Sequence, residues 1–276
     1  MKWNEWIETN QCRKNIKPCL APASWRRTVL SYLTRLTGRD REEFYDDHLA
    51  HFLTFIAGAA NAGGFMAFQR YTSHMTGIAS ASADSLAIGE WQLFLAGLIA
   101  IIAFISGAAF SAILINWGRR KNLHSQFAVP LLLESLLLAV FGFLGDWMQQ
   151  FHAFYFPATA LLLCFIMGLQ NAMITKMSGA RIRTTHITGM VTDIGIEIGK
   201  SLYWNRDPAY STEHHVRGDR KKIRLLLNFV ALFFLGGLAG GIGYNWSGFI
   251  ATLFLATLLF LLAIMPVLQD IIRSNR

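Results

Sequence analysis

The sequence predicts an all-α polytopic membrane protein with six transmembrane helices in two related halves. Three observations lead to this fold class: the clustering of apolar residues, the distribution of Lys and Arg, and an internal repeat. Hydrophobic residues make up 53% of the 276 residues and charged residues only 15%, whereas a soluble domain has about a quarter charged residues. The apolar residues fall in long blocks, so we expect lipid to surround most of the chain.

Six apolar blocks are long enough to cross a hydrocarbon core of about 30 Å, which takes roughly 20 residues of helix. They are Leu49–Phe68, Leu93–Trp117, Phe127–Trp147, Tyr155–Met173, Ile223–Tyr244 and Gly248–Leu268. Because a backbone in lipid has to satisfy its own hydrogen bonds, we expect each block to be a helix.

The positions of Lys and Arg predict the orientation. With the N-terminus in the cytoplasm, 24 of the 25 Lys and Arg residues fall on the cytoplasmic side, and only Arg70 lies outside. Both ends of the chain are therefore expected in the cytoplasm. The same distribution accounts for the net charge of +8, so no nucleic-acid partner is expected.

Two sequence patterns recur at a spacing of about 110 residues. The first copy reads G-A-A-N-A at 58–62 and S-H-M-T-G at 73–77, and the second reads G-L-Q-N-A at 168–172 and T-H-I-T-G at 185–189. The repeat predicts three parts: a cytoplasmic N-terminal extension (1–47), a first three-helix repeat (48–150) and a second (151–276), with a cytoplasmic linker at 201–222. Because three crossings per half is an odd number, the halves have to face opposite sides, as in the inverted repeats of many transporters.

Each half carries a polar segment after its first span, called here a TG segment, at residues 70–90 and 176–200. Both segments are too polar to face lipid, yet they are rich in small and apolar residues, so each is expected to form a short re-entrant half-helix. Thr76 and Thr188 are then expected at the N-caps, and Gly77 and Gly189 are expected to let backbone or ligand approach closely. Two inward-pointing helix N-termini favour an anionic or polar group. The alternative is a pair of interfacial loops with capped helices.

The sequences around the TG segments resemble those of a known family. AGAANAGGFMAFQRYTSHMTG, which ends at Gly77, and GLQNAMITKMSGARIRTTHITG, which ends at Gly189, are similar to the YoaK-like family of bacterial membrane proteins. The resemblance runs from about His48 to the C-terminus. It implies placement in the bacterial inner membrane and a role as a permease, in a family classed as a domain of unknown function. Relatives often have Asp where this chain has Asn61, and Asn where it has Ile78.

Polar side chains within the predicted spans are expected to face the bundle interior. The repeat relates Asn61 to Asn171, so these two amides are predicted to lie near each other and, with Gln170, to line a polar path; the alternative is interhelical hydrogen bonding. His74 and His186 are candidates for a proton shuttle or a ligand contact, or for simple bonds to the backbone of the turn. The predicted substrate-binding residues are Asn61, His74, Thr76, Gly77, Gln170, Asn171, His186, Thr188 and Gly189.

Glu134, inside the third predicted span, is the first candidate for proton coupling, because desolvation favours the neutral form of an isolated carboxyl. The alternative is a protonated acid bonded to a facing Ser or Asn. Asp84 and Asp193, in the TG segments, are the further coupling candidates. Glu197 is expected to be a solvated charge.

Small residues at helical spacing mark two further faces. They are Gly236, Gly237, Gly240 and Gly241 in the fifth predicted span and Ala103, Gly107 and Ser111 in the second. Such faces allow close helix contact, and a homo-oligomer through the Gly-rich faces is predicted alongside lipid and a small polar solute as partners. The three cysteines have no metal-site spacing, so neither a metal nor a cofactor is expected.

The leading functional hypothesis is a permease, or secondary transporter, of a small polar or anionic solute, with the proton as candidate coupling ion. The chain contains no P-loop, no G-x-S-x-G and no H-E-x-x-H, so an enzyme is not expected. The alternatives are a channel of the same architecture, and a membrane enzyme or scaffold that transports nothing.

Overall fold

The structure, a computed structural model, describes residues 32–38, 43–68, 71–148, 152–180, 183–204 and 215–274. The chain divides into two units, Met1–Tyr32 and Leu33–Arg276, and all helices discussed below belong to the second. In chain order they are α3 (Glu43–Phe68), α4 (Met75–Ala87), α5 (Trp91–Arg120), α6 (Ala128–Met148), α7 (His152–Met177), α8 (Ile187–Leu202), α9 (Arg220–Ser247), the 3-10 helix η2 (Gly248–Ile250) and α10 (Ala251–Ser274). The described residues contain no strand, so the all-α class is confirmed. Most of the predicted 1–47 extension lies outside the described residues.

Five segments of the described chain are long and apolar enough to cross a membrane. They are Glu43–Met66, Trp91–Arg120, Ala128–Gly145, Ala158–Met177 and Arg220–Ile272. The first four correspond to the first four predicted spans, and the fifth, of 53 residues, contains both remaining ones. Several membrane-spanning helices are therefore confirmed, but the structure gives five such segments where the sequence predicts six spans.

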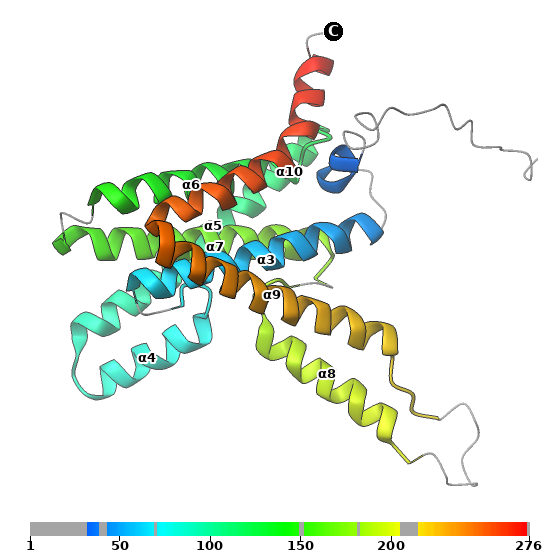
Figure 1. Ribbon diagram of the computed structural model, residues 1–276, viewed down its shortest axis with the longest axis horizontal. Helices are drawn as coiled ribbons and strands as arrows, with labels where there is room; N and C mark the ends of the chain where they lie inside the picture. The colour runs from blue at the N-terminus through cyan, green and yellow to red at the C-terminus, as the bar shows by residue number, and fades with distance from the viewer. Residues whose placement is uncertain are drawn as a thin grey trace, which may run out of the picture. The chain divides into compact units, whose positions relative to one another are not determined.

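A backbone break lies inside the longest of these segments. Gly248 follows α9 with φ 58° and ψ −142°, and its N–H donates to the Tyr244 carbonyl. This left-handed conformation favours glycine, and the short helix η2 follows at once. Figure 1 shows the chain reversing its direction between α9 and α10.

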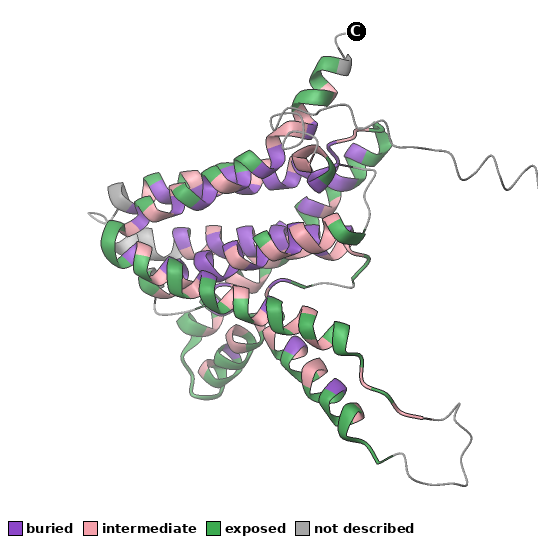
Figure 2. Ribbon diagram, turned by 45° about the vertical axis from the view of Figure 1, so that its right-hand side comes forward, coloured by how far each residue is buried: buried purple, intermediate pink, exposed green. Residues whose placement is uncertain are grey.

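The apolar helices are buried to very different extents. In an apolar stretch of 18 residues in α3, 67% of the residues are buried, whereas in the corresponding stretch of α5 only 17% are buried. Figure 2 shows that the short helices α4 and α8 are mostly exposed. The α5 surface that is left exposed carries large apolar side chains such as Ile102, Ile105 and Ile113. A helix that exposes this many apolar side chains is suited to lipid rather than water.

The long helices pack in three main pairs, α3 with α9, α5 with α7, and α6 with α10 (Figure 1). The short helix α4 packs on α5, and α8 packs on α9. In chain order, α3, α4, α5 and α6 of the first half correspond to α7, α8, α9 and α10 of the second. Under this correspondence, the α3–α9 contact of one half is the counterpart of the α7–α5 contact of the other. The α4–α5 pair likewise becomes the α8–α9 pair. The pairing is thus reciprocal between the two halves of the chain.

The α3–α9 pair is formed by glycines that face phenylalanine carbonyls. A methyl group on Gly58 would overlap the Phe233 carbonyl oxygen, and one on Gly236 would overlap the Phe55 carbonyl oxygen. Only a residue without Cβ lets the two backbones come this close.

The α5–α7 pair repeats this arrangement. A methyl group on Gly107 would overlap the Phe165 carbonyl oxygen, and one on Gly168 would overlap the Phe104 carbonyl oxygen. In all four cases the glycine follows a phenylalanine by three residues in its own helix. The sequence pattern F-x-x-G therefore marks both reciprocal contacts.

Candidate functional site

The two TG segments fold into short helices. Helix α4 has 13 residues and α8 has 16, so their lengths are about 20 and 24 Å, less than the hydrocarbon core of about 30 Å. Figure 1 shows both helices on the same side of the longer ones, each running outward from the middle. A short helix in each TG segment is therefore present in the structure.

The predicted threonine N-caps are wrong. His74 and His186 occupy the N-cap positions, and neither imidazole makes a capping hydrogen bond. Thr76 and Thr188 lie inside the first turns and are exposed. In each repeat, the residue before the histidine forms a hydrogen bond to the preceding long helix.

That bond comes from the asparagine of each repeat. The Asn61 Oδ1 atom accepts hydrogen bonds from the Ser73 N–H at 3.3 Å and the Ser73 hydroxyl at 2.9 Å. In the second repeat, the Thr185 hydroxyl donates to Asn171 Oδ1 at 2.6 Å, and Asn171 Nδ2 donates to the Met167 carbonyl. Both asparagines therefore tie the end of a long helix to the start of a short one.

The hydrogen bonds of Asn61 and Asn171 do not test the prediction that these two amides lie near each other. Each asparagine bonds within its own repeat, and the contact between α3 and α7 runs instead through Gln170, whose Nε2 donates to the Leu53 carbonyl at 3.5 Å. Leu53 lies eight residues before Asn61, which is about 12 Å of helix rise. The substrate roles of Asn61, Gln170 and Asn171 stay predictions.

Gly77 and Gly189 are needed for a local reason. A methyl group on Gly77 would overlap the His74 ring, and one on Gly189 would overlap the His186 ring. The spacing H-x-x-G thus lets each N-cap histidine fold over the first turn of its helix. Both rings are exposed, which leaves them free to meet a solute.

The three carboxylates of the TG segments have different surroundings. Asp84 is exposed on α4, whereas Asp193 on α8 lies 3.5 Å from the Lys222 ammonium of α9. Glu197 was predicted to be solvated, and this is wrong, because it is 3% exposed. It accepts the Asp219 N–H at 3.0 Å and pairs with the Lys200 and Lys222 ammonium groups at 3.0 and 3.3 Å.

These contacts stabilise the charged form of Glu197. They lower the pKa of its carboxyl to about 2, chiefly through the Asp219 N–H and next through the Lys200 ammonium. Two helices meet at this carboxylate: α8, which carries Glu197, and α9, which contributes Lys222 and its N-cap residue Asp219. Asp219 also accepts the N–H groups of Lys221 and Lys222 as the N-cap of α9. Glu197 therefore anchors α8 to the start of α9.

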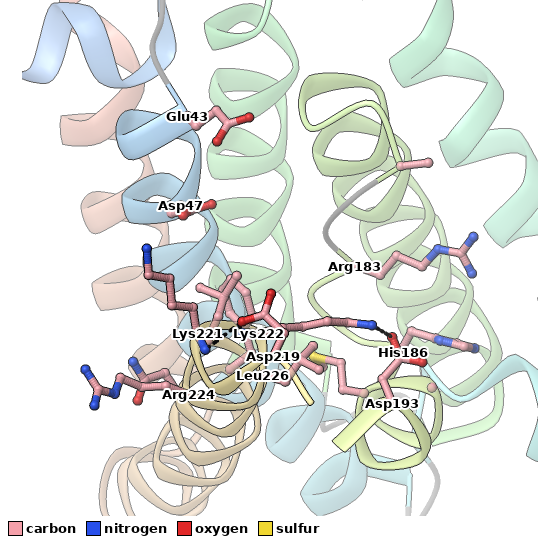
Figure 3. A pocket seen from close by; sticks show the side chains of 16 residues that line it. Glu43, Asp47, Arg183, His186, Asp193, Asp219, Lys221, Lys222, Arg224 and Leu226 are labelled. Carbon is pink, nitrogen blue, oxygen red and sulfur yellow. Dashed lines mark hydrogen bonds and ion pairs between the residues drawn. The ribbon is translucent and has the colours of Figure 1, made fainter. Parts of the chain in front are cut away.

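A cleft of about 910 Å³ opens beside this anchor. Figure 3 shows Glu43 and Asp47 of α3 on one side and Arg183 and His186 on the other. Lys222 reaches across to Asp193 between them. The apolar part of the lining comes from Met190, Leu225, Leu226 and Phe229. Of the predicted site residues, the cleft includes His186, Gly189 and Asp193.

Glu134 lies away from the cleft, fully buried on α6. Both of its carboxyl oxygens lack a hydrogen-bond partner in the described part of the chain. The Gln170 amide of α7 lies beside this carboxyl without a hydrogen bond of ordinary geometry. The side chain beside Glu134 is therefore Gln170, whereas the alternative prediction expected a Ser or an Asn there.

The Gly-rich faces make their close contacts inside one chain. Gly236 and Gly240 approach Phe55 and Ala59 of α3, and Gly107 approaches α7. Only Gly241 has open space around it among the four glycines of α9 that were predicted to mediate contacts. A homo-oligomer through this face stays a prediction.

Sequence reasoning missed the anchor at Glu197 and the four F-x-x-G contacts. The F-x-x-G pattern is visible in the sequence once the four apolar blocks are aligned, so it could have been found. The anchor could not have been found from the sequence, because Lys222 is 25 residues from Glu197 and looks like any other basic loop residue.

Among the described residues, no group of three or more His, Cys, Asp or Glu side chains could hold a metal ion.

An all-helical chain with several apolar segments, exposing large apolar side chains on its outer helices, defines a multi-pass integral membrane protein. Comparison with known families agrees: a model described as "Protein of unknown function (DUF1275)" matches residues 49–265. The chain belongs to this family. It is 26% identical to the UPF0700 transmembrane protein YoaK of Bacillus subtilis (strain 168) over 167 residues, which cover 59% of this chain and 71% of that protein. No solved structure matches the chain.

Proposed function

We propose that this protein is a permease, a secondary transporter of a small polar or anionic solute, built from a 3+3 inverted repeat. The reciprocal packing of the two halves carries the proposal. Helix α3 packs on α9 as α7 packs on α5, and both pairs use the same Phe carbonyl–Gly contact. A two-fold axis between the halves produces such an exchange, and inverted repeats with short half-helices are typical of secondary transporters.

The inverted arrangement needs six spans, with α9 and α10 crossing separately. A single helix of 53 residues would extend about 80 Å, more than twice the hydrocarbon core, and Gly248 breaks it. Three spans per half place the two TG segments on opposite sides of the membrane. Placement in a bacterial inner membrane with both ends in the cytoplasm then keeps 24 of the 25 Lys and Arg residues inside.

The TG segments supply the solute path in this proposal. Helices α4 and α8 act as re-entrant half-helices, and the cleft at α8 is the cytoplasmic entrance. Its lining combines acidic and basic side chains with an apolar floor, which suits a small polar or charged solute. Rocking of one three-helix half against the other gives alternating access.

Transport is tested with purified protein in liposomes. We expect counterflow of at least one labelled solute from a set of phosphate, short carboxylates and amino acids. Protein-free liposomes provide the control. No counterflow of any solute would contradict a permease and favour an enzyme or scaffold.

The Glu134→Gln variant separates a proton-coupled carrier from a channel. A carrier should lose accumulation against the solute gradient when a pH gradient is applied, while downhill exchange continues. A channel of the same architecture should keep its full flux in this variant.

A further inference from the structure

Two polar side chains from different helices are buried with oxygen atoms that lack hydrogen-bond partners. Glu134 on α6 and Gln170 on α7 are both 0% exposed. Both carboxyl oxygens of Glu134 and the amide oxygen of Gln170 lack a partner in the described chain. The Gln170 amide lies beside the Glu134 carboxyl, so the two side chains adjoin each other in the buried contact between α6 and α7.

No cation in the described chain neutralises Glu134. Among the charged groups on the neighbouring helices, Lys176 bonds to Asn116, Asp270 accepts two N–H groups of the loop before α6, and Arg119 lies over the Phe127 ring. An unpaired carboxylate in such a place is very costly, and the group takes up a proton instead.

A single proton can join the two side chains. A neutral carboxylic acid gains an O–H donor, and the amide oxygen of Gln170 is an acceptor that has no donor. A sodium ion would need more oxygen ligands than Glu134 and Gln170 offer, since cations of this kind take about six. The chemistry of the site therefore fits a proton better than a metal cation.

The packing of the helices does not require polar side chains at the positions of Glu134 and Gln170. In the other repeat the position of Gln170 is taken by Ala60, which is equally buried. Helix α10, the counterpart of α6, has no acidic residue before Asp270. The carboxyl–amide pair is therefore an addition to one half of a framework that folds without it in the other.

We infer that Glu134 and Gln170 form a buried proton-binding site, in which the Glu134 carboxylic acid donates to the Gln170 amide oxygen. The site lies between the first half of the chain, through α6, and the second half, through α7. Movement of the halves against each other separates donor from acceptor and so changes the affinity for the proton. This use in coupling rests on the proposed function, whereas the proton site itself does not.

Infrared spectroscopy of the purified protein tests the site directly. The carbonyl stretch of a protonated carboxyl is expected at neutral pH, and it should disappear in Glu134→Gln. In Gln170→Leu the band should remain but move, because the acid has lost its acceptor. Glu90→Gln, which removes an exposed acid, is the matched control and should leave the band unchanged.

Two results would overturn the site. A band that survives in Glu134→Gln would show that the protonated carboxyl lies elsewhere, and an unshifted band in Gln170→Leu would show that Gln170 is not its acceptor. The second comparison keeps Glu134 in place, so it holds even if Glu134→Gln folds poorly. If both band changes occur but liposomes accumulate no solute under a pH gradient, the proton site stands and the proposed transport fails.

Discussion

At the scale of single residues, Asn61 acts through its oxygen atom. Both of its hydrogen bonds use Oδ1 as the acceptor, from the N–H and the hydroxyl of Ser73. An aspartate would offer an acceptor oxygen at the same place. Asn171 differs, because its Nδ2 atom also donates to the Met167 carbonyl.

We therefore expect Asn61→Asp to be tolerated and Asn61→Leu to destabilise the protein. The leucine leaves the Ser73 hydroxyl and N–H without an acceptor, at a cost of about 1–3 kcal/mol. Thermal unfolding in detergent measures both variants. Equal destabilisation by Asp and Leu would contradict the role given to the oxygen atom.

The candidate site residues were partly predictable from the sequence. The paired motifs N-A and H-x-T-G marked the asparagines and histidines as special positions, but the sequence predicted neither the asparagine ties nor the histidine N-caps. The burial of Glu197 was not predictable, since it depends on Lys222 and Asp219 across a linker. Burial of Glu134 followed from hydropathy, but its facing partner Gln170 required the packing of α6 on α7.

At the scale of helices, the F-x-x-G contacts hold the two reciprocal pairs together. A side chain at Gly236 would meet the Phe55 carbonyl oxygen, which belongs to a backbone that cannot move aside. Gly241 on the same helix has nothing within 4 Å. The two glycines thus form a matched pair for a test of helix packing.

Gly236→Ala is expected to lower stability by about 1–3 kcal/mol, because the added methyl group forces α3 and α9 apart. Gly241→Ala is expected to be neutral or slightly stabilising, because alanine favours a helix. Thermal unfolding of both variants in the same detergent compares them. A destabilisation in Gly241→Ala as large as in Gly236→Ala would contradict the packing.

The attachment of α8 to α9 is expected to depend on pH. The pKa of Glu197 falls from 4.5 to about 2 in the folded protein, so its contribution to stability is present above about pH 4.5 and is lost as the pH falls toward 2. Lys200 and Lys222 are 42% and 43% exposed, so salt should weaken their part of the effect.

The wild type should therefore be more stable than Glu197→Gln at neutral pH, and the difference should shrink as the pH falls from 4.5 to 2. Unfolding curves at several pH values test this, with Asp84→Asn as the control. A difference that stays constant down to pH 2 would exclude a role for the Glu197 charge.

Helix positions were largely predictable, and helix pairing was not. Blocks of apolar residues gave the long helices because lipid selects for them along their whole length. The TG segments gave α4 and α8 because small residues without proline allow a helix. Which helix packs on which depends on contacts such as Phe55 with Gly236, between residues far apart in the chain.

At the scale of the whole molecule, the account depends on one relation between the two halves. The repeat in the sequence and the exchange of helix partners both indicate a two-fold axis. Close glycine contacts join α3 with α9 and α5 with α7 within the chain. If each half has three spans, α4 and α8 are reached from opposite sides of the membrane.

Single cysteines on α4 and α8 test this relation most directly. Ser80→Cys and Val191→Cys, both at exposed positions, are placed in a variant without Cys12, Cys19 and Cys164 and treated with a membrane-impermeant maleimide in vesicles of each orientation. We expect Cys at position 80 to react only from outside and Cys at position 191 only from the cytoplasmic side. Reaction of both from the same side would contradict the inverted repeat.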